Sequence, residues 1–216
     1  MAAHVYRLAD KTRVPSVSTI IKFIETDHEG LLYWAWQLGA DGLTLEEGRQ
    51  PAADVGTIAH AAVEADLGGH PIDLSEVAEA VRKQVDACLD AWRLWRASVG
   101  CKVIASEVSM VSEALRFGGR ADHVLVVQDK RVLLDLKTGA RLYPKELLQI
   151  AGYGLLWNER HPELPIEQYS LLRLGKEDGA FTWHHRPAES MGPVFAAFVA
   201  CRGMYDLAKA VQRMIR

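Results

Sequence analysis

The feature that most constrains the fold is a pair of apolar, strand-like runs that follow one another almost without a break. The first run spans residues 117–128 and the second spans residues 131–137, with Asp129-Lys130 at the turn between them. Two such runs joined by so short a connection are typical of a tight β-hairpin. The sequence therefore predicts two neighbouring antiparallel strands in this region.

The second of these runs, VLLDLKTG, carries an acid and a base two residues apart. Successive side chains of a strand point to opposite faces, so Asp135 and Lys137 share one face and Leu134 and Leu136 share the other. One face is then core, and the other presents a carboxylate beside an amine. An isolated D-x-K triplet is most often a strand-end salt bridge or part of a solvated edge, so its surroundings must decide.

The order of the remaining elements predicts the fold class. Further strand-like segments lie at 102–111, 166–175 and 180–186, and helix-like segments at 15–24, 31–42, 57–67, 144–158 and 188–214, with one more helix capped by Ser75 and ended by Gly100. This order predicts an α/β domain in which helices flank one central mixed β-sheet. We expect residues 1–55 to form an N-terminal helical lobe that packs with a core of residues 56–216 as one compact unit. The segment EEGRQPAADVG between them reads as a loop.

Composition excludes several classes of protein. The chain has 216 residues, enough for one domain, and no apolar run reaches the ~20 residues needed to span a bilayer. The N-terminus lacks the apolar segment of a secretory signal, so we expect no membrane partner and, by default, a cytoplasmic location in a bacterial or phage-infected cell. The net charge of −3 argues weakly against a polyanion partner, although residues 101–216 alone are mildly basic.

Polar residues suited to chemistry recur along the chain in a fixed order. Each has an ordinary alternative, since two residues four apart on a helix form a common surface contact. Taken together they form the pattern H-x-x-x-E, E, D, D-x-K and Q-x-x-x-Y. In this sequence these residues are His60, Glu64, Glu107, Asp122, Asp135, Lys137, Gln149 and Tyr153.

This constellation resembles the PD-(D/E)XK nuclease superfamily. It is most similar to the RecB-type branch, which includes phage exonucleases and the mitochondrial genome-maintenance exonuclease. The segments that carry the resemblance are GTIAHAAVEADL, FGGRADHVLVVQDKRVLLDLKTG and LLQIAGYGLLW, with VPSVSTII as a further likeness near the N-terminus. The resemblance implies a restriction-endonuclease-like core and hydrolysis of phosphodiester bonds.

The resemblance also implies roles for single residues. Asp122 and Asp135 would bind a divalent metal, His60 would contribute to its binding, and Lys137 would be the catalytic lysine. Carboxylate oxygens suit Mg²⁺ or Mn²⁺, and the imidazole favours Mn²⁺. We expect the Leu136 carbonyl as an additional ligand. The remaining residues of the pattern would act beside these: Glu64 or Glu107 as an accessory acid, and Gln149 and Tyr153 in orienting the water or the phosphate.

One departure from part of that branch concerns cysteine. Some relatives of this type hold an iron–sulfur cluster with four cysteines, whereas this chain has only Cys88, Cys101 and Cys201, far apart in the sequence. These cannot supply the four ligands, so we predict no iron–sulfur cluster. Because no helicase motif is present, we expect a stand-alone nuclease or a small subunit recruited by a recombination or replication protein.

Several residues could contact DNA directly. Tyr33, Trp34 and Trp36 could stack on unpaired bases, or could form the core of the N-terminal lobe. Arg116, Arg120 and Lys145 could reach phosphates, or could balance the acids and face solvent. The leading hypothesis is a metal-dependent DNA exonuclease that prefers single-stranded or frayed ends, in phage-type recombination, repair or DNA processing. The alternatives are a structure-specific endonuclease of the same fold and a DNA-binding subunit that does not cut.

Overall fold

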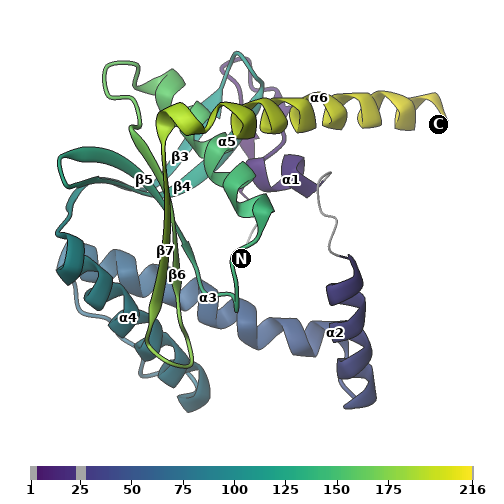
Figure 1. Ribbon diagram of the computed structural model, residues 1–216. Helices are drawn as coiled ribbons and strands as arrows, with labels where there is room; N and C mark the ends of the chain where they lie inside the picture. The colour runs from purple at the N-terminus through teal and green to yellow at the C-terminus, as the bar shows by residue number, and fades with distance from the viewer. Residues whose placement is uncertain (1–3, 23–27, 216) are drawn as a thin grey trace.

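The computed structural model describes residues 4–22 and 28–215, apart from the side chains of residues 28–31, 34, 45 and 47–53. A central β-sheet crosses this part of the chain, with helices on both of its faces (Figure 1). No helix that the structure describes is long and apolar enough to cross a membrane. The expectation of an α/β core built on one central sheet is confirmed.

The central sheet has five strands in the order of the sequence. They are β3 (Lys102–Ser112), β4 (Phe117–Val127), β5 (Lys130–Lys137), β6 (Gln168–Leu174) and β7 (Phe181–Pro187). Strands β5 and β6 pair in parallel, and the other neighbours pair antiparallel, so the sheet is mixed as predicted. A parallel pair needs a long crossover, and helix α5 (Pro144–Arg160) supplies it.

Helices cover both faces of this sheet. Besides α5 they are α1 (Val17–Ile21), α2 (His28–Ala40), α3 (Leu45–Gly68), α4 (Glu79–Val99) and α6 (Gly192–Met214), which follows a short 3₁₀ turn at Ala188–Ser190. Figure 1 shows α3 and α4 against one face of the sheet, and α1, α5 and α6 on the other side. A small hairpin of β1 (Tyr6–Arg7) and β2 (Arg13–Val14) precedes α1, and the sequence analysis did not predict it.

Each face of the sheet has its own hydrophobic core. Leu134 and Leu136 of β5 pack with Val63, Trp92 and Trp95 of α3 and α4. Leu133 points the other way and joins the core formed by α1, α5 and α6. Leu134 and Leu136 thus form the core face that was predicted for β5. The opposite face, which carries Asp135, is also covered, by α5, and the Asp135 residue is 1% exposed.

The connection predicted as a loop at residues 46–56 is helical. Helix α3 runs without interruption from Leu45 to Gly68, so the proposed boundary at 55/56 falls inside a helix. Gly48 and Pro51 have low helix propensity, but the apolar stripe that begins at Val55 and continues through Ala59 is fully buried against the sheet and α4. Packing thus lets the helix begin earlier in the sequence than propensity predicts. A separate N-terminal lobe stays a prediction.

Helix α4 begins later than predicted. Its N-cap is Ala78, which makes no side-chain cap, and not Ser75. The backbone N–H of Ser75 donates to the Asp73 carboxylate at 2.9 Å. This local bond holds Ser75 in a turn, which explains why the helix begins four residues further on.

Candidate metal and catalytic site

The site begins where β4 and β5 separate. Their regular pairing extends from the turn at Val127 and Lys130 up to His123 and Leu134. Beyond this point the Asp122 carboxylate accepts a hydrogen bond from the backbone N–H of Leu136 at 2.8 Å. A side chain thus takes the place of a backbone acceptor, and the Asp122 carboxylate is held against the strand that carries D-x-K.

Three predicted residues from three different elements converge beside this split. His60 of α3, Glu107 of β3 and Asp122 of β4 each offer one ligand atom, and these atoms all lie within 4.8 Å of one another. The Nδ1 atom of His60 is 3.5 Å from an oxygen of Asp122. Mn²⁺ can bind both an imidazole nitrogen and carboxylate oxygens, whereas Mg²⁺ prefers the carboxylate oxygens.

Glu107 reaches this cluster from an unusual backbone conformation. Its φ is 52°, although its neighbours Ser106 and Val108 both pair regularly with β4. A non-glycine residue in this region costs ~1–3 kcal/mol, and such costs are concentrated at functional sites. The Glu107 carboxylate pairs with Arg120 Nε at 2.7 Å. Burial, followed by the charge of Asp122, raises the pKa of Glu107.

A chain of polar contacts starts at Asp135. Its carboxylate pairs with Lys137 Nζ at 2.5 Å. Lys137 also donates to Gln149 Oε1 at 3.1 Å, and Gln149 donates through Nε2 to the Tyr153 hydroxyl at 2.9 Å. The four side chains on β5 and α5 are therefore connected in one line. The spacings of two and four residues account for its two outer links, and the packing of α5 on the sheet makes the link between Lys137 and Gln149.

Burial and like charge act together on this chain. Burial raises the pKa of Asp135, Lys137 opposes the shift, and the charge of Asp122 adds to it. For Lys137, burial would lower the pKa, but the carboxylates of Asp135 and Asp122 outweigh it and the pKa is raised. Burial is also the main cause of the raised pKa of Tyr153, so this hydroxyl keeps its proton. Lys137 is thus a buried ammonium.

The other predicted residues differ in how close they are to this centre. Glu64 is exposed and is not one of the three clustered ligands, although its charge acts on the pKa of Glu107. Arg120 pairs with Glu107, as the charge-balancing alternative predicted. Arg116 belongs to the turn between β3 and β4, where its carbonyl accepts from Arg202. A contact of Arg116 with phosphate stays a prediction.

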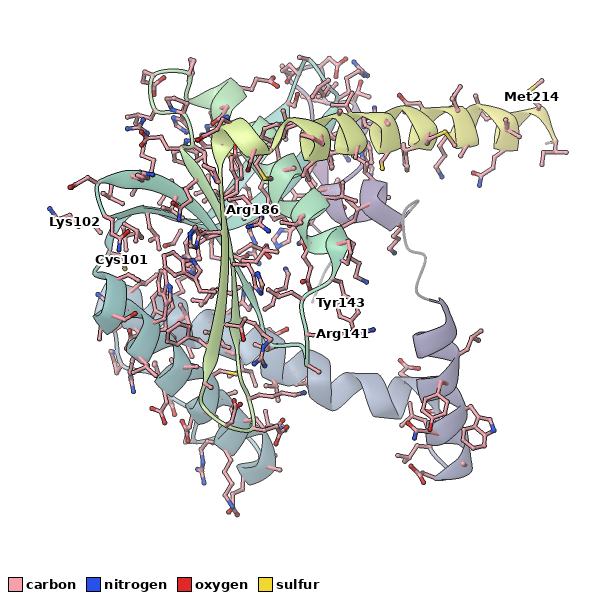
Figure 2. All side chains as sticks on the ribbon, viewed as in Figure 1. Cys101, Lys102, Arg141, Tyr143, Arg186 and Met214 are labelled. Atoms are coloured by element: carbon pink, nitrogen blue, oxygen red, sulfur yellow. The ribbon has the colours of Figure 1, made fainter. Side chains whose placement is uncertain are left out.

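Lys145 and the aromatic residues are on α5 and α2, outside the cluster of acids. The Nζ atom of Lys145 is 5.8 Å from the centre of the Tyr143 ring, on the segment that leads into α5 (Figure 2). On α2, Tyr33 and Trp36 are 61% and 67% exposed and stack on each other at 6.0 Å, so the alternative that they form a core is wrong for these two. The side chain of Trp34 lies outside the described residues.

The sequence analysis missed two residues that border the site. His123 is buried beside Asp122, with its Nδ1 atom 3.1 Å from Ser106 Oγ, and burial lowers its pKa to about 4. Tyr6 packs on β4 at Gly118, where an added Cβ would be 2.4 Å from the ring. No spacing signal marks either one: His123 lies within an apolar run, and Tyr6 precedes the predicted motifs.

The residues present suit a divalent cation. The carboxylate of Glu107 pairs with Arg120, and the carboxylate of Asp135 pairs with Lys137. The charge of Asp122 nevertheless raises the pKa of both Glu107 and Asp135, so the three acids lie close together. Clustered carboxylates repel one another, and a divalent metal ion that prefers oxygen ligands supplies the positive charge that offsets this repulsion. The structure therefore contains a possible acidic metal site.

Comparison with known proteins agrees with this chemistry. The model of the PD-(D/E)XK nuclease superfamily matches residues 33–192. No curated protein matches the sequence. Among solved structures, an alkaline exonuclease, LHK-Exo, from Laribacter hongkongensis is 11% identical, covering 65% of this chain and 77% of its own, with a TM-score of 0.38. The same enzyme in complex with dAMP is also 11% identical and covers 94% and 95%, with a TM-score of 0.40. Because the family model spans most of the chain and includes the D-x-K strand, this chain belongs to the PD-(D/E)XK nuclease superfamily.

Proposed function

We propose that this protein is a metal-dependent DNA exonuclease. The observation that carries the proposal is the convergence of a possible metal site with a buried lysine on two adjacent strands. His60, Glu107 and Asp122 lie within 4.8 Å, and the Asp135–Lys137 pair lies next to Asp122. A protein that only bound DNA would gain nothing from clustered buried acids, which cost free energy.

The metal ligands would come from both sides of the β4–β5 split. Asp122, Asp135 and His60 would hold Mg²⁺ or Mn²⁺, with the Leu136 carbonyl as an additional ligand. Glu107, with its strained backbone, is the better placed of the two accessory acids, because Glu64 is exposed. A divalent ion bound here supplies positive charge to the phosphate and lowers the pKa of a bound water.

The chain's own residues would position the reactants. Lys137 is a compact ammonium held in direction by Asp135 and Gln149, so it can orient the attacking water and stabilise negative charge that develops on the phosphate. Gln149 links Lys137 to the protonated hydroxyl of Tyr153 through two hydrogen bonds. Because Tyr153 is 6% exposed, it acts on the reaction through Gln149.

A preference for single-stranded or frayed ends rests on two supports. The resemblance to exonucleases of the RecB-type branch is one. The exposed stack of Tyr33 and Trp36 is the other, since stacking on a base contributes ~1–3 kcal/mol and needs an unpaired base. Arg120 and Lys145 would contact the strand near the site, and the alternative of a structure-specific endonuclease keeps the same catalytic residues.

Linear and covalently closed circular single strands of one sequence test this proposal. With Mg²⁺ or Mn²⁺ we expect the linear strand to be degraded and the circle to be spared, and EDTA to stop the reaction. Degradation of the circle at the same rate would replace the exonuclease with the endonuclease alternative. Binding without cutting of either substrate, in a preparation that binds metal, would favour the DNA-binding subunit.

A further inference from the structure

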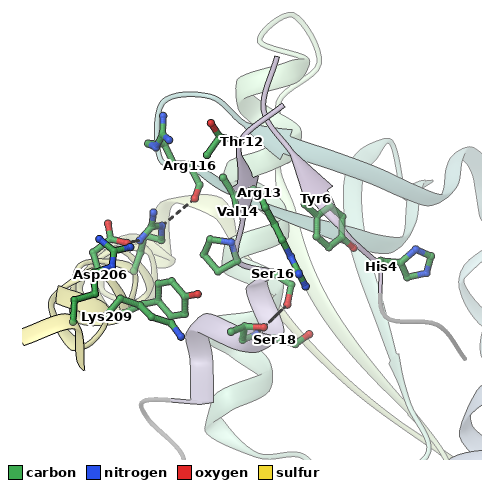
Figure 3. A pocket seen from close by; sticks show the side chains of 15 residues that line it. His4, Tyr6, Thr12, Arg13, Val14, Ser16, Ser18, Arg116, Asp206 and Lys209 are labelled. Carbon is green, nitrogen blue, oxygen red and sulfur yellow. Dashed lines mark hydrogen bonds and ion pairs between the residues drawn. The ribbon is translucent and has the colours of Figure 1, made fainter. Parts of the chain in front are cut away.

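A large basic pocket lies on the α6 side of the molecule. It has a volume of about 870 Å³ and opens between the β1–β2 hairpin, α1 and the C-terminal half of α6 (Figure 3). Five of its lining residues are cationic side chains from three separate segments: Arg13, Arg116, Arg202, Lys209 and Arg213. The volume is within the ~300–1,000 Å³ range of ligand-binding pockets.

A buried arginine, Arg202, holds two walls of this pocket together. The Arg202 side chain, which is only 8% exposed, donates through Nε to the carbonyls of Leu115 and Arg116 at 3.0 and 3.2 Å. It also pairs with Asp206 one turn along α6 at 2.5 Å. Arg202 thereby fixes α6 to the β3–β4 turn, which brings Arg116 beside the cations of the helix.

The protein balances only part of the pocket's positive charge: Asp206 lines the pocket and pairs with Arg202. Among the side chains that the structure describes, no carboxylate forms an ion pair with Arg13, Lys209 or Arg213. The whole chain has a net charge of −3, so this local excess of positive charge runs against the composition. Cations held together without counter-charges attract an anion, because binding it removes their mutual repulsion.

Neutral groups in the pocket also suit a phosphate-bearing chain. Ser16, Ser18 and Thr19 supply hydroxyl groups along one wall. Tyr205 lies between two cations, with Arg202 and Lys209 each 5.7 Å from the centre of its ring. Hydroxyls donate to phosphate oxygens, and an aromatic ring among cations can stack on a base. A nucleic acid offers both phosphates and bases, whereas an acidic peptide has no base.

The pocket is joined to the candidate catalytic site through β4. Tyr6 lines the pocket and packs on Gly118, and at the next residue an added Cβ on Gly119 would be 2.8 Å from the ring of Tyr153. Arg120 and Glu107 also act on the pKa of Tyr6, which burial raises. One short stretch of β4 therefore has the pocket on one side and the Lys137–Gln149–Tyr153 chain on the other.

We propose that this pocket binds internal phosphodiester groups of a single nucleic-acid strand, on the part of the strand that lies beyond the bond being cut. This proposal rests on the proposed nuclease function, and it extends the substrate contact from the metal site to the surface between the β1–β2 hairpin and α6. The cations hold the backbone, and Tyr205 stacks on a base.

The test compares two double charge reversals. Lys209→Glu with Arg213→Glu removes pocket cations, and Lys102→Glu with Lys130→Glu makes the same change in net charge at exposed positions. Lys102 lies on the other side of the molecule from Met214 (Figure 2), and Lys130 is at the same end of the sheet, since the two pair with Val126 and Val127 of β4. Binding of a labelled 15-nucleotide oligothymidylate without terminal phosphates is measured in EDTA, over a range of salt concentrations. We expect the pocket variant to bind at least about 10-fold more weakly, with a salt slope smaller by roughly 1 to 1.5, since each contact with a single strand contributes ~0.7. The control should stay within about twofold of wild type.

A second measurement separates this inference from the proposed function. The small substrate thymidine 5′-monophosphate p-nitrophenyl ester reaches the metal site but is too short to reach the pocket. With Mn²⁺ the pocket variant should hydrolyse it at the wild-type rate. If the wild-type protein cuts neither this ester nor a strand, the proposed function fails, whereas a loss of binding in EDTA would still support the pocket as a nucleic-acid site.

Four results would overturn the inference. The first is equal oligothymidylate affinity in the pocket variant and wild type. The second is an equal loss in the control variant, which would indicate net charge alone. The third is a loss of affinity confined to oligonucleotides with a 5′- or 3′-phosphate, which would indicate a site for a terminal phosphate. The fourth is unchanged oligothymidylate binding with pocket-dependent binding of polyglutamate, which would indicate an acidic protein partner.

Discussion

Asp66 and Asp122 are buried to the same degree but have opposite surroundings. Their side chains are 15% and 14% exposed. Asp66, near the end of α3, accepts hydrogen bonds from Trp92 Nε1 at 2.9 Å, Arg93 Nε at 3.0 Å and Arg96 Nη1 at 3.0 Å. Asp122 accepts one backbone hydrogen bond. Burial raises the pKa of its neighbours Glu107 and Asp135, and the charge of Asp122 adds to this rise.

The difference distinguishes a structural acid from a functional one. The pKa of Asp66 is lowered, because although burial opposes ionisation, the hydrogen bonds from Arg93 and Trp92 outweigh it. Its partners are on α4, so this acid ties α3 to α4. The acids around Asp122 have raised pKa values, which means that the protein alone does not compensate their charge. We infer that they are retained for a cation and for the reaction, at some cost in stability.

The largest expected effect is that of Asp122→Asn on activity. The amide oxygen can still accept from the Leu136 N–H, so the fold is kept, but a charged ligand is lost. We expect cleavage to fall by roughly 1,000-fold or more, since a metal ion contributes several kcal/mol to the transition state. The free energy of unfolding, measured in urea without metal, should be unchanged or higher, because repulsion of Asp135 and Glu107 is relieved. A large loss of stability would contradict this reading.

Gln149→Leu should have the next largest effect. The substitution keeps the side-chain volume close to that of glutamine but removes the acceptor for Lys137 and the donor to Tyr153. We expect kcat to fall by about 10- to 100-fold, the range typical for loss of a group that orients an active-site residue. Mn²⁺ affinity should not change, since Gln149 is not a proposed ligand. A variant with weaker metal binding and unchanged kcat would show that Gln149 supports the metal site instead.

Asp66→Asn is the matched substitution at the other acid. Loss of its charged hydrogen bonds should lower the free energy of unfolding by about 1–3 kcal/mol. At a temperature where the variant is folded, cleavage should equal that of wild type. If Asp66→Asn reduced activity as much as Asp122→Asn, the distinction between the two acids would be lost.

The smallest effect concerns pH. The folded-state pKa of Asp66 lies below its unfolded value of about 3.9, so the unfolded chain binds more protons as pH falls. The stability contribution of Asp66 is therefore complete above about pH 5 and is lost as pH falls through the lowered pKa. The difference in unfolding free energy between wild type and Asp66→Asn, measured from pH 7 to pH 3, should be constant above about pH 5 and shrink below it. A constant difference would show that the charge of Asp66 is not its source.

How far the sequence predicts this site depends on how local each feature is. The Asp135–Lys137 and Gln149–Tyr153 contacts follow from spacings of two and four residues, which strand and helix geometry fix. The Lys137–Gln149 contact that joins them depends on how α5 packs on the sheet, which no local spacing predicts. The position of Arg116 does not follow, because a turn and a buried contact with Arg202 direct it to another surface. The φ of Glu107 is likewise set by how β3 pairs with β4, and no local pattern predicts it.

The same reasoning applies to the fold. The strands β3, β4 and β5 were predicted within one or two residues, since apolar runs and a hairpin turn define them locally. The continuity of α3 was not, because burial of Val55 and Ala59 against other elements extends it. The β1–β2 hairpin was missed, because each of its strands has only two residues and too little pattern to detect.

Calorimetric titration of Mn²⁺ into wild type, Asp122→Asn and Asp66→Asn tests the central claim most directly. The claim is that the acids around Asp122 form a metal site, whereas the equally buried Asp66 is structural. We predict that wild type and Asp66→Asn bind Mn²⁺ with the same affinity, and that Asp122→Asn binds it at least about 10-fold more weakly. Equal affinity in wild type and Asp122→Asn, or weakened binding in Asp66→Asn alone, would contradict the account.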